Sequence, residues 1–164
     1  MNEDTDISIY VACLASYNAG KLYGAWIELD YIDDLDELQE KVQEMLEESP
    51  IPNAEEWAIH DTENLSGDIG LEIAWNTHEI IKEHGDIARA AIEYSGMEYA
   101  AELCENFCGS FKSYEEYGDY CLESDDVPEH LLTYIDSESY GKDSAENYTS
   151  VEYDGYIYLF NTNC

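Results

Sequence analysis

A polar stretch of the sequence places a lysine directly after a glycine, in the motif Asn18-Ala19-Gly20-Lys21. Such a Gly-Lys pair can bind a phosphate group. A P-loop requires the pattern G-x-x-x-x-G-K-[ST] at the start of a helix, whereas Leu22 follows the lysine here. The motif also lies between apolar segments that we expect to be strands. We therefore expect a turn at Gly20 and no nucleotide site.

A calcium site could form from Asp61, Glu63 and Glu72, which match positions 1, 3 and 12 of an EF-hand loop. Leu65, however, occupies position 5, and Ser66 replaces the glycine that position 6 requires. The pattern is incomplete, so we expect no metal ion at these residues.

Catalytic chemistry has little support in the sequence. Cys104 and Cys108 share a helical face, but no C-x-x-C or paired histidines complete a zinc site, so we expect buried thiols. His60 and Asp61 could form a catalytic pair, but the sequence offers no convincing nucleophile beside them, so we expect both residues to have a structural role. Because some carboxylates must lie close together among 39 acidic residues, a carboxylate- or metal-dependent hydrolase stays open as an alternative. The sequence favours a protein that is not an enzyme and uses no cofactor.

A row of carboxylates is the clearest chemical feature of residues 33–48, where the apolar residues recur at helical spacing around Leu35. The opposite face carries five acidic residues, here called the acidic stripe: Asp33, Glu37, Glu40, Glu44 and Glu47. A helix rises 1.5 Å per residue, so these carboxylates follow one another at intervals of about 5–6 Å. Only Lys41 lies nearby to offset their repulsion. A solvated helix face usually mixes both signs of charge, so the stripe favours a basic partner.

The whole chain is strongly acidic. Its 164 residues include 39 Asp and Glu against 6 Lys and Arg, which gives a formal net charge of −33. Such chains are often disordered, but 45% of the residues are hydrophobic, including 15 Tyr, so we expect a folded protein. Duplex DNA carries one charge per about 1.7 Å, so a charge of this size corresponds to roughly 56 Å of duplex, or about 16 base pairs.

The charge also limits the partners that the protein can bind. Without a basic patch, we expect binding neither to nucleic acid nor to a membrane, and a basic surface on another protein is the natural partner. No apolar run approaches the 18 residues of a membrane-spanning helix, and the N-terminus has no signal-peptide pattern. The five cysteines fit no disulfide framework. We expect a soluble, cytoplasmic protein.

The first third of the chain predicts a small sheet with one covering helix. Residues 7–14 and 23–29 are short and apolar, and the polar turn ASYNAGK between them predicts a hairpin. The helix at 33–48 follows, Pro50 ends it, and residues 55–61 form a third strand.

The middle of the chain predicts helices over residues 69–84, 87–94 and 97–107, with Gly96 as a stop. The segment 107–113 then predicts a strand. Ser113 and Glu116 form a capping box for the next helix, which runs to about Glu123.

The end of the chain predicts one more helix and a hairpin. Pro128 suits the first turn of a helix toward Tyr140, and residues 151–160 predict a hairpin around Asp154 and Gly155. The fold class is therefore α+β. We expect a β-β-α-β domain over 1–62, a helical middle domain over 63–106 and an α+β C-terminal domain over 107–164.

Three segments, in this order, resemble the ArdA antirestriction proteins: IYVACLASYNAGKLYGAWIEL (9–29), EEWAIHDTE (55–63) and DDVPEHLLTYIDSESYGKD (125–143). The first carries the pattern Y-N-x-G-x-L-x-G-x-W from Tyr17 to Trp26. The resemblance covers essentially the whole chain, and the middle matches mainly in its helical, acidic character.

This resemblance implies a protein carried by mobile genetic elements that imitates B-form DNA. It implies three small domains in a row, an elongated surface and a homodimer formed through the C-terminal domain. The expected target is the DNA-binding groove in the methyltransferase and specificity core of type I restriction-modification enzymes, which such a protein blocks competitively. A module aimed at another basic DNA-binding protein, such as a nucleoid protein or a repressor, stays open as the alternative.

The expected site residues fall into two groups. Besides the acidic stripe, we expect phosphate-mimicking carboxylates at Glu98, Glu102, Glu105, Glu115, Glu116 and Asp119. By resemblance, we expect the dimer interface to include Leu131, Leu132, Tyr134, Ile135 and Tyr140.

Overall fold

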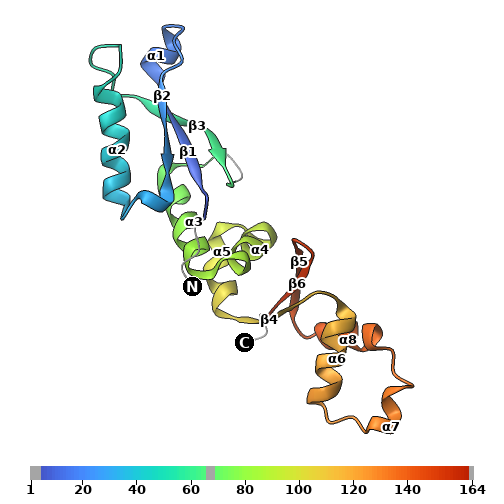
Figure 1. The fold of residues 1–164 in the computed structure, drawn as a ribbon. Coiled ribbons are helices and arrows are strands. Elements are labelled where there is room, and N and C mark those ends of the chain that lie inside the picture. Colours follow the sequence, from blue (N-terminus) through green and yellow to red (C-terminus); the bar gives the residue numbers. More distant parts are fainter. Residues whose placement is uncertain (1–4, 66–68, 163–164) are drawn as a thin grey trace. The chain divides into compact units, whose positions relative to one another are not determined.

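A computed structural model describes residues 5–65 and 69–162 (Figure 1). The chain divides into two compact units, Met1–Gly85 and Asp86–Cys164, and each contains helices and one small antiparallel sheet. The predicted α+β class is confirmed. The elongated arrangement and the three domains over 1–62, 63–106 and 107–164 stay predictions.

The sheet of the first unit consists of β1 (Ser8–Cys13), β2 (Gly24–Glu28) and β3 (Trp57–Glu63), in the order β2-β1-β3. Both pairings are antiparallel, with Ile9 opposite Ile27 on one side and Thr62 on the other. Ile9 and Val11 are fully buried. The predicted hairpin of the first two strands and the third strand beside them are thus confirmed.

The connection between β1 and β2 differs from the polar turn that we expected, because it begins with a short helix, α1 (Leu14–Asn18). Ser16 is fully buried in this helix, and its hydroxyl lies 3.1 Å from that of Ser49. The Lys21 amide donates to the Ser16 carbonyl at 2.8 Å. Gly20 has a φ of 80°, so the chain does turn at this glycine as predicted.

Two helices and a 3₁₀ turn complete the first unit: η1 (Leu29–Tyr31), α2 (Leu35–Glu47) and α3 (Leu71–His84). Helix α2 buries Leu38, Val42, Met45 and Leu46, the apolar face that the sequence predicted. The Tyr23 hydroxyl donates to the Met45 carbonyl at 2.8 Å, which ties the end of α2 to the entry of β2.

The sheet of the second unit has the order β4-β6-β5 and is antiparallel throughout. Its buried residues include Ile157, Leu159 and Phe160. Asp154 and Gly155 have φ angles of 48° and 80°, so the predicted hairpin turn is confirmed. The elements of this unit are α4 (Asp86–Ser95), α5 (Met97–Glu105), β4 (Phe107–Phe111), α6 (Tyr114–Ser124), α7 (Glu129–Leu132), α8 (Ser137–Ala145), β5 (Thr149–Tyr153) and β6 (Tyr156–Phe160).

The single helix predicted from Pro128 toward Tyr140 is wrong, because α7 ends at Leu132 and α8 begins at Ser137. The Asp136 side chain accepts a hydrogen bond from the Ser139 amide at 3.0 Å and so caps a new helix. Pro128 stands at the N-cap of α7, one residue before the first turn. A side-chain cap in the middle of the segment therefore divides it into two helices.

Helices α6 and α8 pack closely through two glycines. A Cβ atom added to Gly118 would overlap the Ser137 carbonyl, and one added to Gly141 would overlap the Tyr114 carbonyl. Both glycines are buried. Only glycine permits the two backbones to approach this closely.

Candidate binding surface

The acidic stripe lies on α2 and its N-terminal approach, as predicted. Asp33, Glu40, Glu44 and Glu47 are exposed, while Glu37 is half-buried. The Asp34 side chain accepts from the Glu37 amide at 2.8 Å, and a carboxylate oxygen of Glu37 accepts from the Asp33 amide at 2.7 Å. These two bonds fix the start of the helix, although Glu37 reaches back one residue further than in a standard capping box, to the residue before the N-cap Asp34. Glu37 therefore has a structural role that its place in the acidic stripe did not predict.

Little positive charge offsets the stripe. The Lys41 ammonium lies 3.5 Å from a Glu44 carboxylate oxygen, and both side chains are exposed. A surface pair of this kind contributes no more than about 1 kcal/mol. The stripe therefore keeps most of its negative charge.

The six acidic residues predicted in the second unit are all exposed. Glu98, Glu102 and Glu105 lie on α5, and the other three on α6. The Glu116 amide donates to the Ser113 hydroxyl at 3.1 Å, and the Glu116 carboxylate accepts from the Lys112 amide at 2.6 Å. The predicted cap at Ser113 is confirmed, although Glu116 reaches back one residue further than in a standard capping box.

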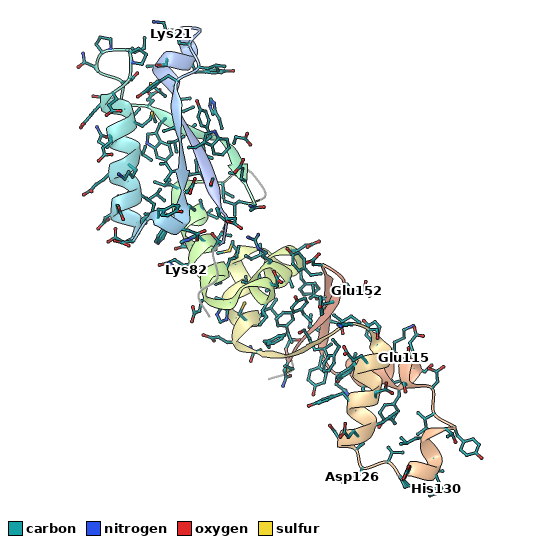
Figure 2. The ribbon with its side chains drawn as sticks, in the orientation of Figure 1. Lys21, Lys82, Glu115, Asp126, His130 and Glu152 are labelled. Carbon is teal, nitrogen blue, oxygen red and sulfur yellow. The ribbon has the colours of Figure 1, made fainter. Side chains whose placement is uncertain are left out.

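The predicted phosphate-mimicking residues are divided between the two units. The acidic stripe belongs to the first unit, and Glu98, Glu102, Glu105, Glu115, Glu116 and Asp119 belong to the second. In Figure 2, Glu115, Asp126 and Glu152 project from the second unit. Within the described residues, every Asp and Glu except Asp30 and Glu37 is exposed. The carboxylates are thus distributed over the surface.

Asp30 is a carboxylate with several internal hydrogen-bond partners. It accepts from the Thr5 amide, the Thr5 hydroxyl and the Asp6 amide, each at 2.9 Å. His78 Nε2 lies 3.0 Å from it. Burial opposes ionisation of Asp30, but these hydrogen bonds outweigh burial and lower the pKa of its carboxyl. Asp30 is therefore a structural anion.

The incomplete calcium pattern does not form a loop. Asp61 and Glu63 lie in β3, and Glu72 lies in the first turn of α3. Ser66 lies outside the described residues. Among the residues that the structure describes, no group of three or more His, Cys, Asp or Glu side chains is arranged to hold a metal ion.

The expectation of two buried thiols on one helix is half wrong. Cys104 is buried on α5, but the helix ends at Glu105, and Cys108 is exposed on β4.

His60 is exposed, and its ring packs edge-on against Tyr17 with centroids 5.3 Å apart. No helix within the described ranges is long and apolar enough to cross a membrane.

The residues expected at a dimer interface include exposed apolar side chains. Leu131 and Leu132 are 42% and 38% exposed, Tyr134 is 85% exposed, and Ile135 and Tyr140 are half-buried. The Tyr140 hydroxyl donates to Asp125, and this hydrogen bond raises the pKa of the tyrosine. Whether these residues form an interface stays a prediction.

Fold and surface together define a small, strongly acidic α+β protein whose carboxylates are spread over its surface. Residues 9–158 match the family model of the antirestriction protein ArdA, and the chain belongs to this family. A comparison with curated proteins found no match. The family consists of antirestriction proteins, and membership in it supports an antirestriction function, directed at restriction-modification enzymes in general.

Proposed function

We propose that this protein imitates DNA and competitively blocks the DNA-binding groove of type I restriction-modification enzymes. The observation that carries the proposal is the exposure of nearly all described acidic residues in both units. In this mechanism, carboxylates take the positions of DNA phosphates against lysine and arginine side chains of the groove, in the methyltransferase and specificity core.

The acidic stripe supports this mechanism through its spacing. Consecutive carboxylates along this helix face follow one another at about 5–6 Å, so they form a regular row of like charges, at a lower linear density than the roughly 3.4 Å per charge of a single DNA strand. Lys41 is the one basic residue on this helix, and its partner Glu44 belongs to the stripe. A large net negative charge also attracts a basic groove over long distances and speeds the encounter.

A carboxylate surface carries no base edges, so it has no sequence to be read. Phosphate contacts position a DNA-binding protein, whereas base contacts specify its sequence. We therefore propose that type I enzymes with different recognition sequences are inhibited alike. The cytoplasmic location, the origin in a mobile element and the homodimer through Leu131, Leu132, Tyr134, Ile135 and Tyr140 belong to the same proposal.

A restriction assay tests the proposed function. Purified protein is added to a type I enzyme with unmodified DNA, at low and raised salt. We expect cleavage to stop at low salt and to recover partly at raised salt, because added ions screen the attraction between carboxylates and the groove. Undiminished cleavage at an excess of protein would refute the type I target, and salt-insensitive inhibition would refute the electrostatic mechanism.

A further inference from the structure

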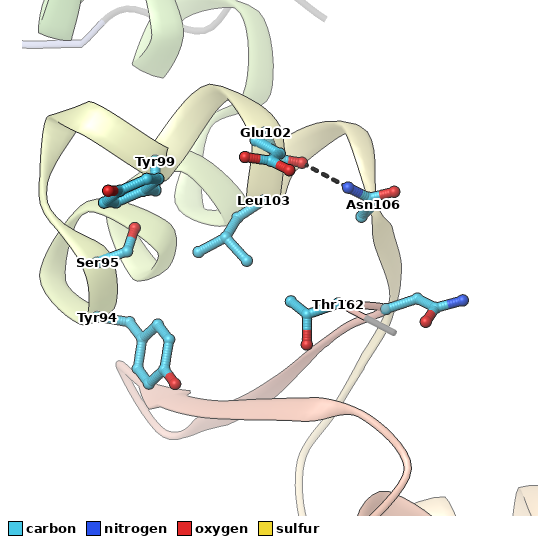
Figure 3. Close-up of a pocket in the computed structure, with 8 residues that line it drawn as sticks. Tyr94, Ser95, Tyr99, Glu102, Leu103, Asn106 and Thr162 are labelled. Carbon is cyan, nitrogen blue, oxygen red and sulfur yellow. Dashed lines mark hydrogen bonds between the residues drawn. The ribbon is translucent and has the colours of Figure 1, made fainter. Parts of the chain in front are cut away.

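The second unit contains an open pocket of about 270 Å³ between α4, α5 and the end of β6 (Figure 3). Tyr94 comes from the last turn of α4, and Tyr99, Glu102 and Leu103 come from α5. Thr162 closes the side next to β6. Pockets that enclose drug-sized ligands measure roughly 300–1,000 Å³, so this pocket suits a single side chain.

Two aromatic rings are exposed at this pocket. Tyr94 and Tyr99 are 59% and 53% exposed, whereas Leu103 beneath them is 6% exposed. Figure 3 shows the Leu103 side chain pointing into the space between Tyr94 and Thr162. The pocket thus has an apolar floor and aromatic faces that remain accessible to a partner.

Hydrogen bonds join the segments that line the pocket. The Asn161 amide donates to the Asn106 carbonyl at 2.8 Å, which joins the segment after β6 to the end of α5. Asn106 Nδ2 donates to the Glu102 carbonyl at 2.9 Å. The two helices meet at Gly96, whose φ of 75° suits glycine.

The charges around the pocket favour a cation. Glu102 lines it with an exposed carboxylate, and Glu98 and Glu105 lie on the same helix. Glu102 and Asn106 also stand at the C-terminal end of α5, where the helix dipole favours positive charge. An anionic ligand, or a second copy of this acidic chain, would meet repulsion here.

We propose that this pocket receives an arginine side chain of the target enzyme, and the proposal rests on the proposed function for the identity of the target. A guanidinium group is planar, so it stacks on tyrosine faces and forms a forked pair with a carboxylate such as Glu102. A lysine ammonium has neither property to the same degree. Arginines that contact phosphates are common in DNA-binding grooves, so a protein that replaces DNA would meet them.

The first experiment titrates the full-length protein with tetra-arginine and tetra-lysine peptides at about 0.15 M ionic strength and follows amide resonances by NMR. We expect shifts at residues 94–106 that are larger for tetra-arginine, with about two- to fivefold tighter binding at this place. The variant Y94A/Y99A should lose the preference for arginine while keeping the net charge. An unchanged preference in this variant, or none in the unmodified protein, would overturn the proposal.

Matched variants separate stacking from other effects. Y94F/Y99F keeps both ring faces and should keep the preference, so its loss there would contradict stacking. The variant Y17A/Y31A removes two exposed tyrosines of the first unit and should bind both peptides normally. Circular dichroism and a cooperative urea transition check that each variant is folded.

The second experiment measures inhibition of a type I enzyme. Y94A/Y99A should need severalfold more protein than the unmodified chain for the same inhibition. If the unmodified protein does not inhibit, the proposed target is refuted, while the peptide titration still tests the pocket. If sedimentation shows that Y94A/Y99A dissociates an oligomer, a second copy occupies the pocket and the arginine proposal is wrong.

Discussion

His78 Nε2 lies 3.0 Å from Asp30 Oδ1, and this contact joins helix α3 to η1 and, through Thr5 and Asp6, to the segment that leads into β1. His78 is 1% exposed, and its ring lies 4.9 Å from that of Trp75. Its Nδ1 atom is buried without a hydrogen-bond partner among the described residues. The contact therefore holds three segments of the first unit around one buried imidazole.

The stability of the first unit should depend on pH through His78. Burial lowers the pKa of this histidine, although Asp30 and Glu79 act in the opposite direction and Lys82 adds to the lowering. The unfolded chain then binds more protons below its own pKa of about 6.5, so stability falls as the pH drops from there toward the folded pKa. Urea unfolding of His78→Gln between pH 7 and 5 should show a weaker pH dependence than the unmodified protein. His60→Gln, at an exposed histidine, is the control, and equal curves for all three proteins would contradict the assignment.

Removing the charge of Asp30 should destabilise the first unit. Asp30→Asn replaces a carboxylate that accepts from two amides and the Thr5 hydroxyl, and contacts His78, by a neutral amide that is a weaker acceptor. We expect a loss of about 1–3 kcal/mol in the free energy of unfolding, measured in urea. Asp33→Asn, an exposed residue close in the sequence, should change little. If Asp30→Asn were as stable as the unmodified protein, the hydrogen bonds of Asp30 would make no net contribution to the free energy of unfolding.

The contact between α6 and α8 predicts that Gly118→Ala destabilises the second unit. The added methyl group would overlap the Ser137 carbonyl, so the helices must move apart. Overpacking of this kind costs typically 1–3 kcal/mol. Thermal unfolding followed by circular dichroism measures the effect, with Ser139→Ala at an exposed site of α8 as the control. Equal melting temperatures for the two variants would contradict this packing.

The acidic stripe predicts a collective effect on inhibition. A single Glu40→Gln change should alter inhibition very little, because each carboxylate makes a small contribution. The triple variant E40Q/E44Q/E47Q should need clearly more protein for the same inhibition, and it leaves the cap at Glu37 intact. The variant E55Q/E56Q/E63Q removes the same charge from exposed sites outside the stripe. An equal loss in both triple variants would mean that total charge matters and position does not.

The sequence predicted the elements whose determinants are local. The apolar face of α2 and the Asp154-Gly155 turn are examples, because spacing and turn residues within a few positions decide them. Helix α1 was missed, because its buried Ser16 packs against Ser49, which is remote in the sequence. The division between α7 and α8 depends on the Asp136 cap, which competes with the helical pattern on either side.

The candidate surface was predictable in its chemistry and less so in its details. Charge density and spacing pointed to exposed carboxylates, and the structure exposes them. Charge density and spacing could not reveal the structural role of Asp30, because its partners Thr5 and His78 lie 25 and 48 positions away in the sequence. The pocket at Tyr94 and Tyr99 was missed for the same reason, since Thr162 joins it only through the fold.

Competition for DNA is the most direct test of the mechanism. A fluorescently labelled duplex is bound to a type I enzyme, the protein is added, and anisotropy reports the DNA that remains bound. The account predicts complete displacement of the duplex, and it predicts that the directly measured affinity of protein for enzyme falls as salt rises. A ternary complex, in which enzyme holds DNA and protein together while cleavage is inhibited, would contradict DNA mimicry.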